Sequence, residues 1–225
     1  MKKFFTLFLA LALAASLTAC GKTEAPDTSG DDAEKVSYRV GVCQLAQHPA
    51  LDAATQGFVD ALTEELGEAV QIDVQNASGE ATNCSTIING FLSSDVDLIM
   101  ANATPALTAA ASATSEVPIL GTAVTAYGVA LDLDEFDGTV GGNISGTSDL
   151  ADLSKQADML TEWFPEAKNV GLLFCSAEPN SRYQVDEVTK HLTAKGLTCT
   201  EFAFTDSNDL AAVTEKAAAE SEVIY

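Results

Sequence analysis

The sequence is poor in basic residues, in histidine and in catalytic motifs. Its 225 residues include 11 Lys and Arg against 33 Asp and Glu, a formal net charge of −22, and two histidines, His48 and His191. This charge disfavours binding to nucleic acid and to anionic lipid surfaces. No GxSxG elbow, P-loop, HExxH or dinucleotide-binding GxGxxG pattern occurs. We therefore expect no catalytic residues, no bound metal and no cofactor.

The N-terminus has the three parts of a secretory signal. Two lysines precede an apolar stretch at residues 4–17, and small residues then lead to Cys20. The stretch is shorter than the roughly 20 residues of a membrane-spanning helix, so we expect residues 1–19 to be removed. Leu-Thr-Ala-Cys followed by Gly resembles the lipobox of bacterial lipoproteins, which implies a lipidated Cys20 and a membrane anchor. The alternative is an ordinary signal peptide with an incidental cysteine.

The four other cysteines show no metal-binding spacing. Cys43, Cys84, Cys175 and Cys199 form no CxxC pair and no Cys/His cluster, so a zinc site is not expected. Export permits disulfides, and the predicted fold brings Cys43 near Cys84 and Cys175 near Cys199. A bridge within either pair and four free thiols remain alternatives.

From residue 38 onward, short apolar segments alternate with longer amphipathic ones. The pattern predicts strands at 38–44, 70–75, 97–101 and 118–124, and helices at 51–66, 80–91 and 105–114. After a glycine-rich passage at 138–146, it predicts helices at 150–164, 181–194 and 209–219, and strands at 169–174, 197–204 and 222–225. This alternation favours an α/β fold with two Rossmann-like lobes, each built on a parallel sheet.

The domain boundaries follow from this pattern. Residues 20–36 contain almost no apolar side chains and are expected to form a disordered tether. The first lobe is expected at 37–145 and the second at 146–225. The second lobe has only two full strand–helix pairs, and the sequence stops within an apolar run. Because a parallel strand needs cover on both faces, we expect the second lobe to be incomplete.

Candidate binding residues lie in the strand-to-helix loops, because ligands of open parallel sheets bind beyond the carboxyl ends of the strands. Thr104 is placed to cap the helix that follows it, with its hydroxyl accepting from a backbone amide. In a second interpretation, the amides at this helix start bind a ligand carboxylate, and both roles are compatible. Glu178, in a loop of the second lobe, either pairs with a ligand amino group or is simply solvated.

Several segments together carry a family resemblance. YRVGVCQLAQHPALDAATQGFVDAL, NATPALTAAASAT, VPILGTAVT, GGNISGTSDL and SAEPNS resemble the substrate-binding lipoproteins of ABC importers of the aromatic-amino-acid type, which have a type I periplasmic-binding-protein fold. The resemblance extends over residues 38–225. It implies an extracytoplasmic, lipid-anchored protein whose hinged lobes close over a small molecule, an aromatic or related amino acid. Its implied partners are ABC permease and ATPase subunits.

The resemblance also implies a set of ligand-binding residues. Carried over loop by loop, they are Gln44, His48, Thr104, Ala106, Thr122, Thr125, Glu178, Asn180 and Ser181. The chain departs from the family at Gln47, where an acidic residue is usual, and at Ala126–Tyr127, where Asp-Pro is usual. Two other functions remain as alternatives. One is a ligand-sensing domain for a signalling partner, and the other is an exported α/β hydrolase, which needs a nucleophile and a base in the cleft.

Overall fold

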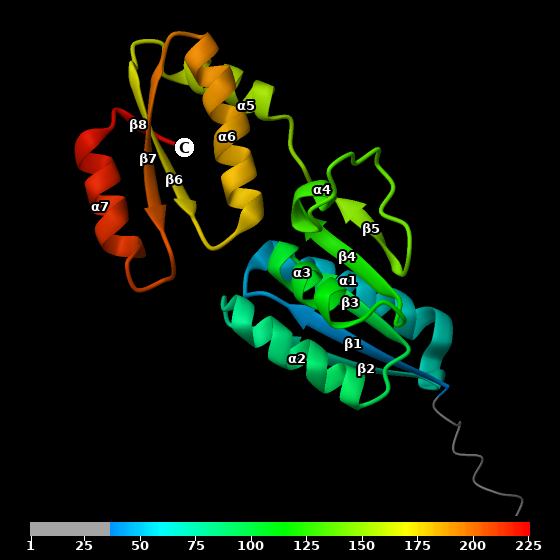
Figure 1. Cartoon of the computed structure of the whole chain (residues 1–225). Helices are drawn as coiled ribbons and strands as arrows, with labels where there is room; N and C mark the ends of the chain where they lie inside the picture. The colour runs from blue at the N-terminus through cyan, green and yellow to red at the C-terminus, as the bar shows by residue number, and fades with distance from the viewer. Residues whose placement is uncertain (1–36) are drawn as a thin grey trace, which may run out of the picture. The chain divides into compact units, whose positions relative to one another are not determined.

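A computed structural model describes residues 37–225 (Figure 1). The expected signal peptide at 1–19, lipidated Cys20 and the tether at 20–36 lie outside the described residues. The first lobe contains a five-stranded sheet in the order β2-β1-β3-β4-β5, in which every neighbouring pair is parallel. Its strands are β1 (Tyr38–Gln44), β2 (Val70–Asn76), β3 (Leu98–Asn102), β4 (Ile119–Val124) and β5 (Ile144–Ser148).

Helices cover both faces of this sheet. They are α1 (Pro49–Leu66), α2 (Ala81–Ser93), α3 (Thr104–Ala113) and α4 (Tyr127–Ala130), with a short 3₁₀ turn, η1 (Gly67–Ala69), after α1. A methyl group at Gly41 of β1 would meet the ring of Phe91 in α2, whereas Gln44 contacts Thr55 in α1. Because side chains alternate along a strand, α1 and α2 lie on opposite faces. The buried core includes Ile88, Ile99, Leu107 and Ile119.

The second lobe contains a three-stranded parallel sheet in the order β7-β6-β8. Its strands are β6 (Asn169–Cys175), β7 (Thr198–Phe204) and β8 (Val223–Ile224), and its helices are α5 (Leu153–Trp163), α6 (Pro179–Ala194) and α7 (Leu210–Glu220). The apolar sides of α5 and α6 pack with β6 in one buried cluster that includes Leu160, Val170 and Leu192.

The predicted order of strands and helices is confirmed, with ends that differ by a few residues. Three elements were not predicted: the 3₁₀ turn η1, the single-turn helix α4 and strand β5, which lies in the glycine-rich passage and its continuation. β5 pairs with β4 from Ile144 to Ser148, so the first sheet extends past residue 145. The boundary expected between residues 145 and 146 falls inside this strand.

Two helix starts illustrate how local sequence sets the fold. His48 is the N-cap of α1, where its Nδ1 accepts a hydrogen bond from the amide of Ala50 at 3.2 Å, and Pro49 takes the first helical position, where its missing N–H is not needed. Asp152 is the N-cap of α5, and its Oδ1 accepts from the amide of Lys155 at 3.2 Å and from the hydroxyl of Ser154 at 2.6 Å.

The Asp152 cap predicts a defined loss of stability in acid. Hydrogen bonds from Ser154 and Lys155 lower the pKa of Asp152 from 3.8 to about 2. Because the folded-state pKa lies below the unfolded value, the contribution is present above about pH 4 and is lost as the pH falls towards 2. Asp152→Ala should therefore lower the free energy of unfolding at pH 7 and have little effect at pH 2. Urea unfolding at several pH values measures this, and a deficit that is equal at both pH values would contradict the assignment.

Candidate functional site

The carboxyl ends of the first four strands form one connected edge. The amide of Leu45 donates to the carbonyl of Asn102 at 3.1 Å, which links the ends of β1 and β3. The carbonyls of Gln44 and Leu45 each accept at 2.8 Å, from the amides of Ala77 and Gly79 in the loop after β2. β4 joins this edge through the Thr122 carbonyl, which accepts from the amide of Ala103 at 2.9 Å. Every loop that the sequence singled out in the first lobe is thus held in place by its neighbours.

The start of α3 is the most unusual point of this edge. Ala103 precedes the helix with φ 86° and ψ 159°, a backbone conformation that is almost restricted to glycine. Such a residue costs of order 1–3 kcal/mol and is typical of ligand clamps and active sites. The first amides of a helix lack intrahelical acceptors, and Pro105 has no N–H, so the amides of Thr104 and Ala106 remain for another partner.

The predicted capping role of Thr104 is wrong. The N-cap of α3 is Ala103, and no side chain caps this helix. Thr104 is the first helical residue and is only 2% exposed, and its hydroxyl oxygen has no hydrogen-bond partner among the described residues. Because a helical residue cannot fold its hydroxyl back onto the first-turn amides as an extended N-cap does, the hydroxyl stays unused. A buried hydroxyl without a partner costs about 1–3 kcal/mol, unless a ligand or water satisfies it.

The other first-lobe candidates differ in what they can offer a ligand. His48 is exposed, with its Nδ1 engaged by the cap of α1. Gln44 is 4% exposed, and its side-chain amide is fully hydrogen-bonded: Nε2 donates to Asp52 at 2.6 Å and to the carbonyl of Ala46 at 2.8 Å, while Oε1 accepts from Thr55 at 2.6 Å. Gln44 therefore holds the site together, and both N–H groups of its side-chain amide are already used.

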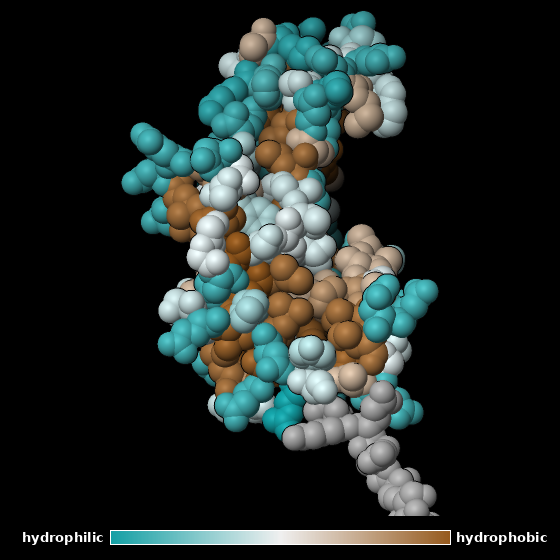
Figure 2. Space-filling model, turned by 90° about the vertical axis from the view of Figure 1, so that its right-hand side faces the viewer, coloured by the Kyte–Doolittle hydropathy of each residue, from teal (hydrophilic) through white to brown (hydrophobic). Residues whose placement is uncertain are grey.

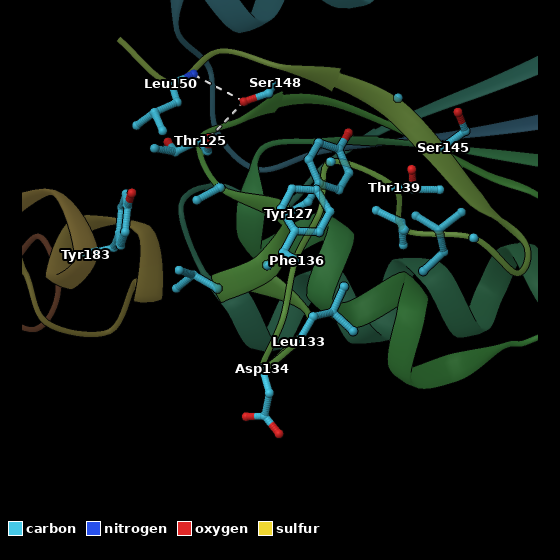
Figure 3. A pocket seen from close by; sticks show the side chains of 18 residues that line it. Thr125, Tyr127, Leu133, Asp134, Phe136, Thr139, Ser145, Ser148, Leu150 and Tyr183 are labelled. Carbon is cyan, nitrogen blue, oxygen red and sulfur yellow. Dashed lines mark hydrogen bonds between the residues drawn. The ribbon is translucent and has the colours of Figure 1, made fainter. Parts of the chain in front are cut away.

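The end of β4 turns sharply beside the edge. Ala123 has φ 51°, and the pairing of β4 with β5 shifts register between Gly121 and Val124. Thr122 is half-buried, and Thr125 is 9% exposed with its carbonyl accepting from the hydroxyl of Ser148 at 2.9 Å. This hydrogen bond ties the β4–α4 loop to β5 (Figure 3).

A cavity of about 760 Å³ opens beside Thr125. Figure 3 shows its wall, to which Tyr127, Leu133 and Phe136 contribute, and residues 138–146 complete this side. Several of its apolar residues are partly exposed, among them Val129, Leu133, Phe136 and Leu150. Figure 2 shows apolar side chains gathered on the face of the first lobe that it presents to the viewer. A second cavity of about 780 Å³ lies beside Gln44, Asp52 and Asn76 and is more polar.

Tyr127, which replaces the usual proline, packs into the sheet. It is 5% exposed, and its hydroxyl donates to the carbonyl of Thr147 at 3.3 Å. A methyl group at Gly121 of β4 or at Gly146 of β5 would collide with this hydroxyl. Burial is the main cause that raises the pKa of the phenol. The ring thus spans β4 and β5, and its remaining surface lines the cavity beside Thr125.

The second-lobe candidates gather at the start of α6, next to the carboxyl end of β6. Glu178 precedes the helix, and its Oε2 accepts from the side-chain amide of Asn180 at 3.4 Å. Ser181 and Glu178 line a cavity of about 360 Å³ with Phe174 and Tyr225. The amide oxygen of Asn180 is buried without a partner among the described residues. Glu178, Asn180 and Ser181 therefore lie together at the start of α6.

Of the two expected cysteine pairs, Cys43 and Cys84 do lie together, whereas Cys175 and Cys199 do not. β6 and β7 pair Cys175 with Phe204 and Cys199 with Val170, so Cys175 and Cys199 lie at opposite ends of this ladder and cannot form a disulfide. Cys84 lies on α2 rather than near a strand end, and both Cys43 and Cys84 are free and 0% exposed. The neighbouring Cys84 thiol and burial raise the pKa of the Cys43 thiol.

Burial predicts a clear order of thiol reactivity. Cys175 and Cys199 are half-buried and should react with iodoacetamide in the native protein, more slowly than a free thiol because burial raises the pKa of each. Cys43 and Cys84 should react only when the protein unfolds. Their alkylation should be at least about 100-fold slower than that of Cys175 and Cys199. Peptide mass mapping of timed alkylation measures this order. Labelling of Cys43 as fast as Cys175 would contradict the packing of α2 on β1.

Two polar residues of the edge were missed by sequence reasoning. Thr55 of α1 and Asn102 of β3 are 8% and 0% exposed and hydrogen-bond to each other at 2.9 Å. A polar residue at the last position of an otherwise apolar strand is the signal that could have pointed to Asn102. Thr55 gives no such signal, because threonine is common on helix surfaces.

Neither metal ligation nor membrane insertion gains support from the described residues. No group of three or more His, Cys, Asp or Glu side chains in residues 37–225 could hold a metal ion. None of the helices in this part of the chain combines the length and the apolar character that a membrane crossing requires.

Comparisons with known proteins agree on one family. Residues 39–225 match the family model described as ABC transporter substrate binding protein. A tyrosine-binding protein of Clostridioides difficile is 31% identical over an alignment of 234 positions, which covers 100% of this chain and 67% of that protein.

Solved structures extend this similarity. An ABC domain from Streptococcus pneumonia in complex with L-Trp shows 32% identity and a TM-score of 0.76, with 82% of this chain and 63% of that chain covered. A ligand-free, open substrate-binding protein with adhesive properties from Clostridium difficile shows 36% identity and a TM-score of 0.56, with 84% and 64% covered. The chain thus spans somewhat less than two thirds of these solved chains. The predicted relationship to ABC transporter substrate-binding proteins and the α/β fold with parallel sheets are confirmed.

Proposed function

Because this chain belongs to the ABC transporter substrate-binding protein family, we propose that it captures a small aromatic amino acid outside the membrane and delivers it to an ABC importer. The observation that carries the proposal is the start of α3. There the buried Thr104 hydroxyl has no partner among the residues that the structure describes, and the amides of Thr104 and Ala106 have no acceptor within the helix. These groups fit the α-carboxylate of an amino acid, which the positive end of the helix dipole also favours.

The second lobe supplies the complementary chemistry. The Glu178 carboxylate is suited to the ammonium group of the ligand, and the unpartnered oxygen of Asn180 can accept a further hydrogen bond. Thr122, Thr125 and the aromatic cavity beside them favour a ligand with an aromatic side chain. The binding of tyrosine and of L-Trp by the two relatives supports the same class of ligand.

Capture of this kind needs no covalent step. The two lobes are proposed to close on a hinge around the ligand, to exclude water, and to present a closed surface to the permease and its ATPase. Cys20, when lipidated, would anchor the protein to the outer side of the membrane. Mass spectrometry after palmitate labelling tests the anchor: the acyl mass should be on Cys20, and its absence from the exported protein would refute the anchor alone.

Identification of a natural ligand tests the function. Protein purified without added ligand should release tyrosine, tryptophan or phenylalanine on denaturation, detected by mass spectrometry. The Thr104→Val variant, purified in the same way, should release less. A sugar or nucleoside in place of an amino acid would refute the proposed specificity.

A further inference from the structure

A chain of buried polar side chains links α1 to the ends of β1 and β3. The amide of Asn102 donates to the hydroxyl of Thr55 at 2.9 Å, and the hydroxyl of Thr55 donates to Oε1 of Gln44 at 2.6 Å. Nε2 of Gln44 then donates to the carboxylate of Asp52 at 2.6 Å. We name these four residues the polar relay. It begins at a fully buried residue, Asn102, and ends at the exposed Asp52 in the polar cavity.

The relay occurs only at the strand ends. On the same face of the sheet, Val40 and Val42 of β1 and Met100 of β3 are buried and apolar. Gln44 and Asn102, the last residues of these strands, are paired in register and are the first polar side chains there. Buried polar side chains destabilise a core unless every group is satisfied, and Oδ1 of Asn102 has no partner among the described residues. Their placement at the binding edge, and not in mid-sheet, indicates a role in the geometry of that edge.

Thr55 is the only member of the relay that must both donate and accept through one atom. A hydroxyl has one donor and two acceptor positions, so it can receive the Asn102 amide and donate to Gln44. Valine has the same shape and can do neither, whereas serine keeps both functions. A substitution at Thr55 therefore breaks the relay in the middle without changing either strand.

The relay holds backbone as well as side chains. Asn102 also donates to the carbonyl of Leu51 at 2.9 Å, and Gln44 also donates to the carbonyl of Ala46 at 2.8 Å. These contacts fix the loop at residues 45–48 and the first turn of α1 against Asn102, which directly precedes Ala103. The strained conformation of Ala103 persists only if its surroundings over-determine it, and Asn102 is its immediate neighbour.

We propose that Thr55 is a positioning residue of the ligand site. Its hydroxyl joins Gln44 to Asn102 and thereby holds the first loop and the start of α3 in the arrangement that receives the ligand. This role rests on the proposed function, because it requires a ligand at the start of α3. Thr55 itself is assigned no contact with that ligand. The polar relay acts through the amides at Thr104 and Ala106.

The test compares Thr55→Val with Thr55→Ser in the full chain. Thr63→Val is the matched control, because Thr63 lies on the same helix and its hydroxyl donates only to the carbonyl of Val59 at 2.8 Å, at an exposed position. Amide hydrogen exchange is measured without ligand, by peptides that cover residues 45–52, 103–107 and 169–175. Dissociation constants for L-tyrosine and L-tryptophan are measured by calorimetry on the same samples.

Thr55→Val should speed exchange about 10-fold in peptides 45–52 and 103–107 and leave 169–175 unchanged, because two buried hydrogen bonds are lost locally. Affinity should fall about 10-fold in the same variant. Thr55→Ser should restore both to within about 3-fold of wild type, and Thr63→Val should alter neither. If Thr55→Val does not fold, Thr55→Cys, whose thiol is a weak donor, should give an intermediate effect.

Three results would overturn the positioning role: unchanged exchange in peptides 45–52 and 103–107, a uniform rise throughout the first lobe, or a failure of serine to restore wild-type behaviour. Unchanged affinity in Thr55→Val, with wild-type protein that binds, would also overturn it. Absence of binding by wild type refutes the proposed ligand. The exchange measurement then still decides whether Thr55 organises the edge.

Discussion

Thr104→Val should lower the affinity for an aromatic amino acid by about 10- to 100-fold, because a hydrogen bond to a charged group contributes roughly 1.5–3 kcal/mol. The same substitution should not destabilise the fold. The hydroxyl of Thr104 is buried and has no partner among residues 37–225, so valine removes an unsatisfied group and keeps the shape. We expect the free energy of unfolding to stay the same or to rise by about 1 kcal/mol.

Calorimetric titration and urea unfolding of one preparation measure both effects. Thr108→Val is the matched control, because Thr108 lies one turn further along α3 and its hydroxyl is already used by the carbonyls of Thr104 at 3.1 Å and Ala130 at 3.2 Å. That variant should lose stability and keep its affinity. Thr104→Val should lower affinity and keep stability, whereas Thr108→Val should lower stability and keep affinity. This contrast distinguishes a role in ligand binding from a role in packing. Equal affinity of Thr104→Val and wild type would show that the Thr104 hydroxyl does not bind the ligand.

Gly121→Ala should destabilise the first lobe by about 1–3 kcal/mol through overpacking. The added methyl group would collide with the hydroxyl of Tyr127 and approach Cζ of the ring at 3.1 Å. Because Tyr127 is 5% exposed and spans β4 and β5, the ring cannot move aside without opening this junction. Chemical unfolding measures the loss.

A double-mutant cycle identifies the cause. Tyr127→Phe removes the colliding oxygen, so Gly121→Ala should cost at least about 1 kcal/mol less in that background than in wild type. Gly57→Ala in α1 is the control: no atom lies within 4 Å of its added methyl group, and alanine should stabilise the helix by about 0.5–1 kcal/mol. Strict additivity at Gly121 and Tyr127 would show that the two side chains do not meet.

The sequence predicted the elements whose burial follows a simple period. β1, β3 and β6 are apolar runs, and α1 and α6 have apolar residues at helical spacing, so each was located to within a few residues. β5 was missed because ISGTS has only one partly buried residue and contains glycine. Its position is set by hydrogen bonds to β4 and by Gly146, whose φ of 153° and contact with Gly121 leave no room for a side chain.

The candidate site was predicted in part, for a similar reason. The loops were located because parallel strands end at one edge, and Thr104, Ala106, Glu178, Asn180 and Ser181 do lie at helix starts there. The orientation of individual side chains was not predictable. Thr104 was predicted to cap α3, but it is the first residue inside that helix. Gln44 was predicted to contact a ligand, but its side chain hydrogen-bonds to Thr55 and Asp52. These outcomes depend on hydrogen bonds between residues far apart in sequence, such as Asn102 and Thr55.

Calorimetric titration of the protein with L-tyrosine and with L-tryptophan tests the central claim most directly. We expect saturable binding of one molecule per chain for at least one of the two amino acids. Binding should weaken in Thr104→Val and persist in Thr108→Val. Absence of binding heat with both amino acids, or binding that Thr104→Val leaves intact, would contradict an amino-acid site at the start of α3.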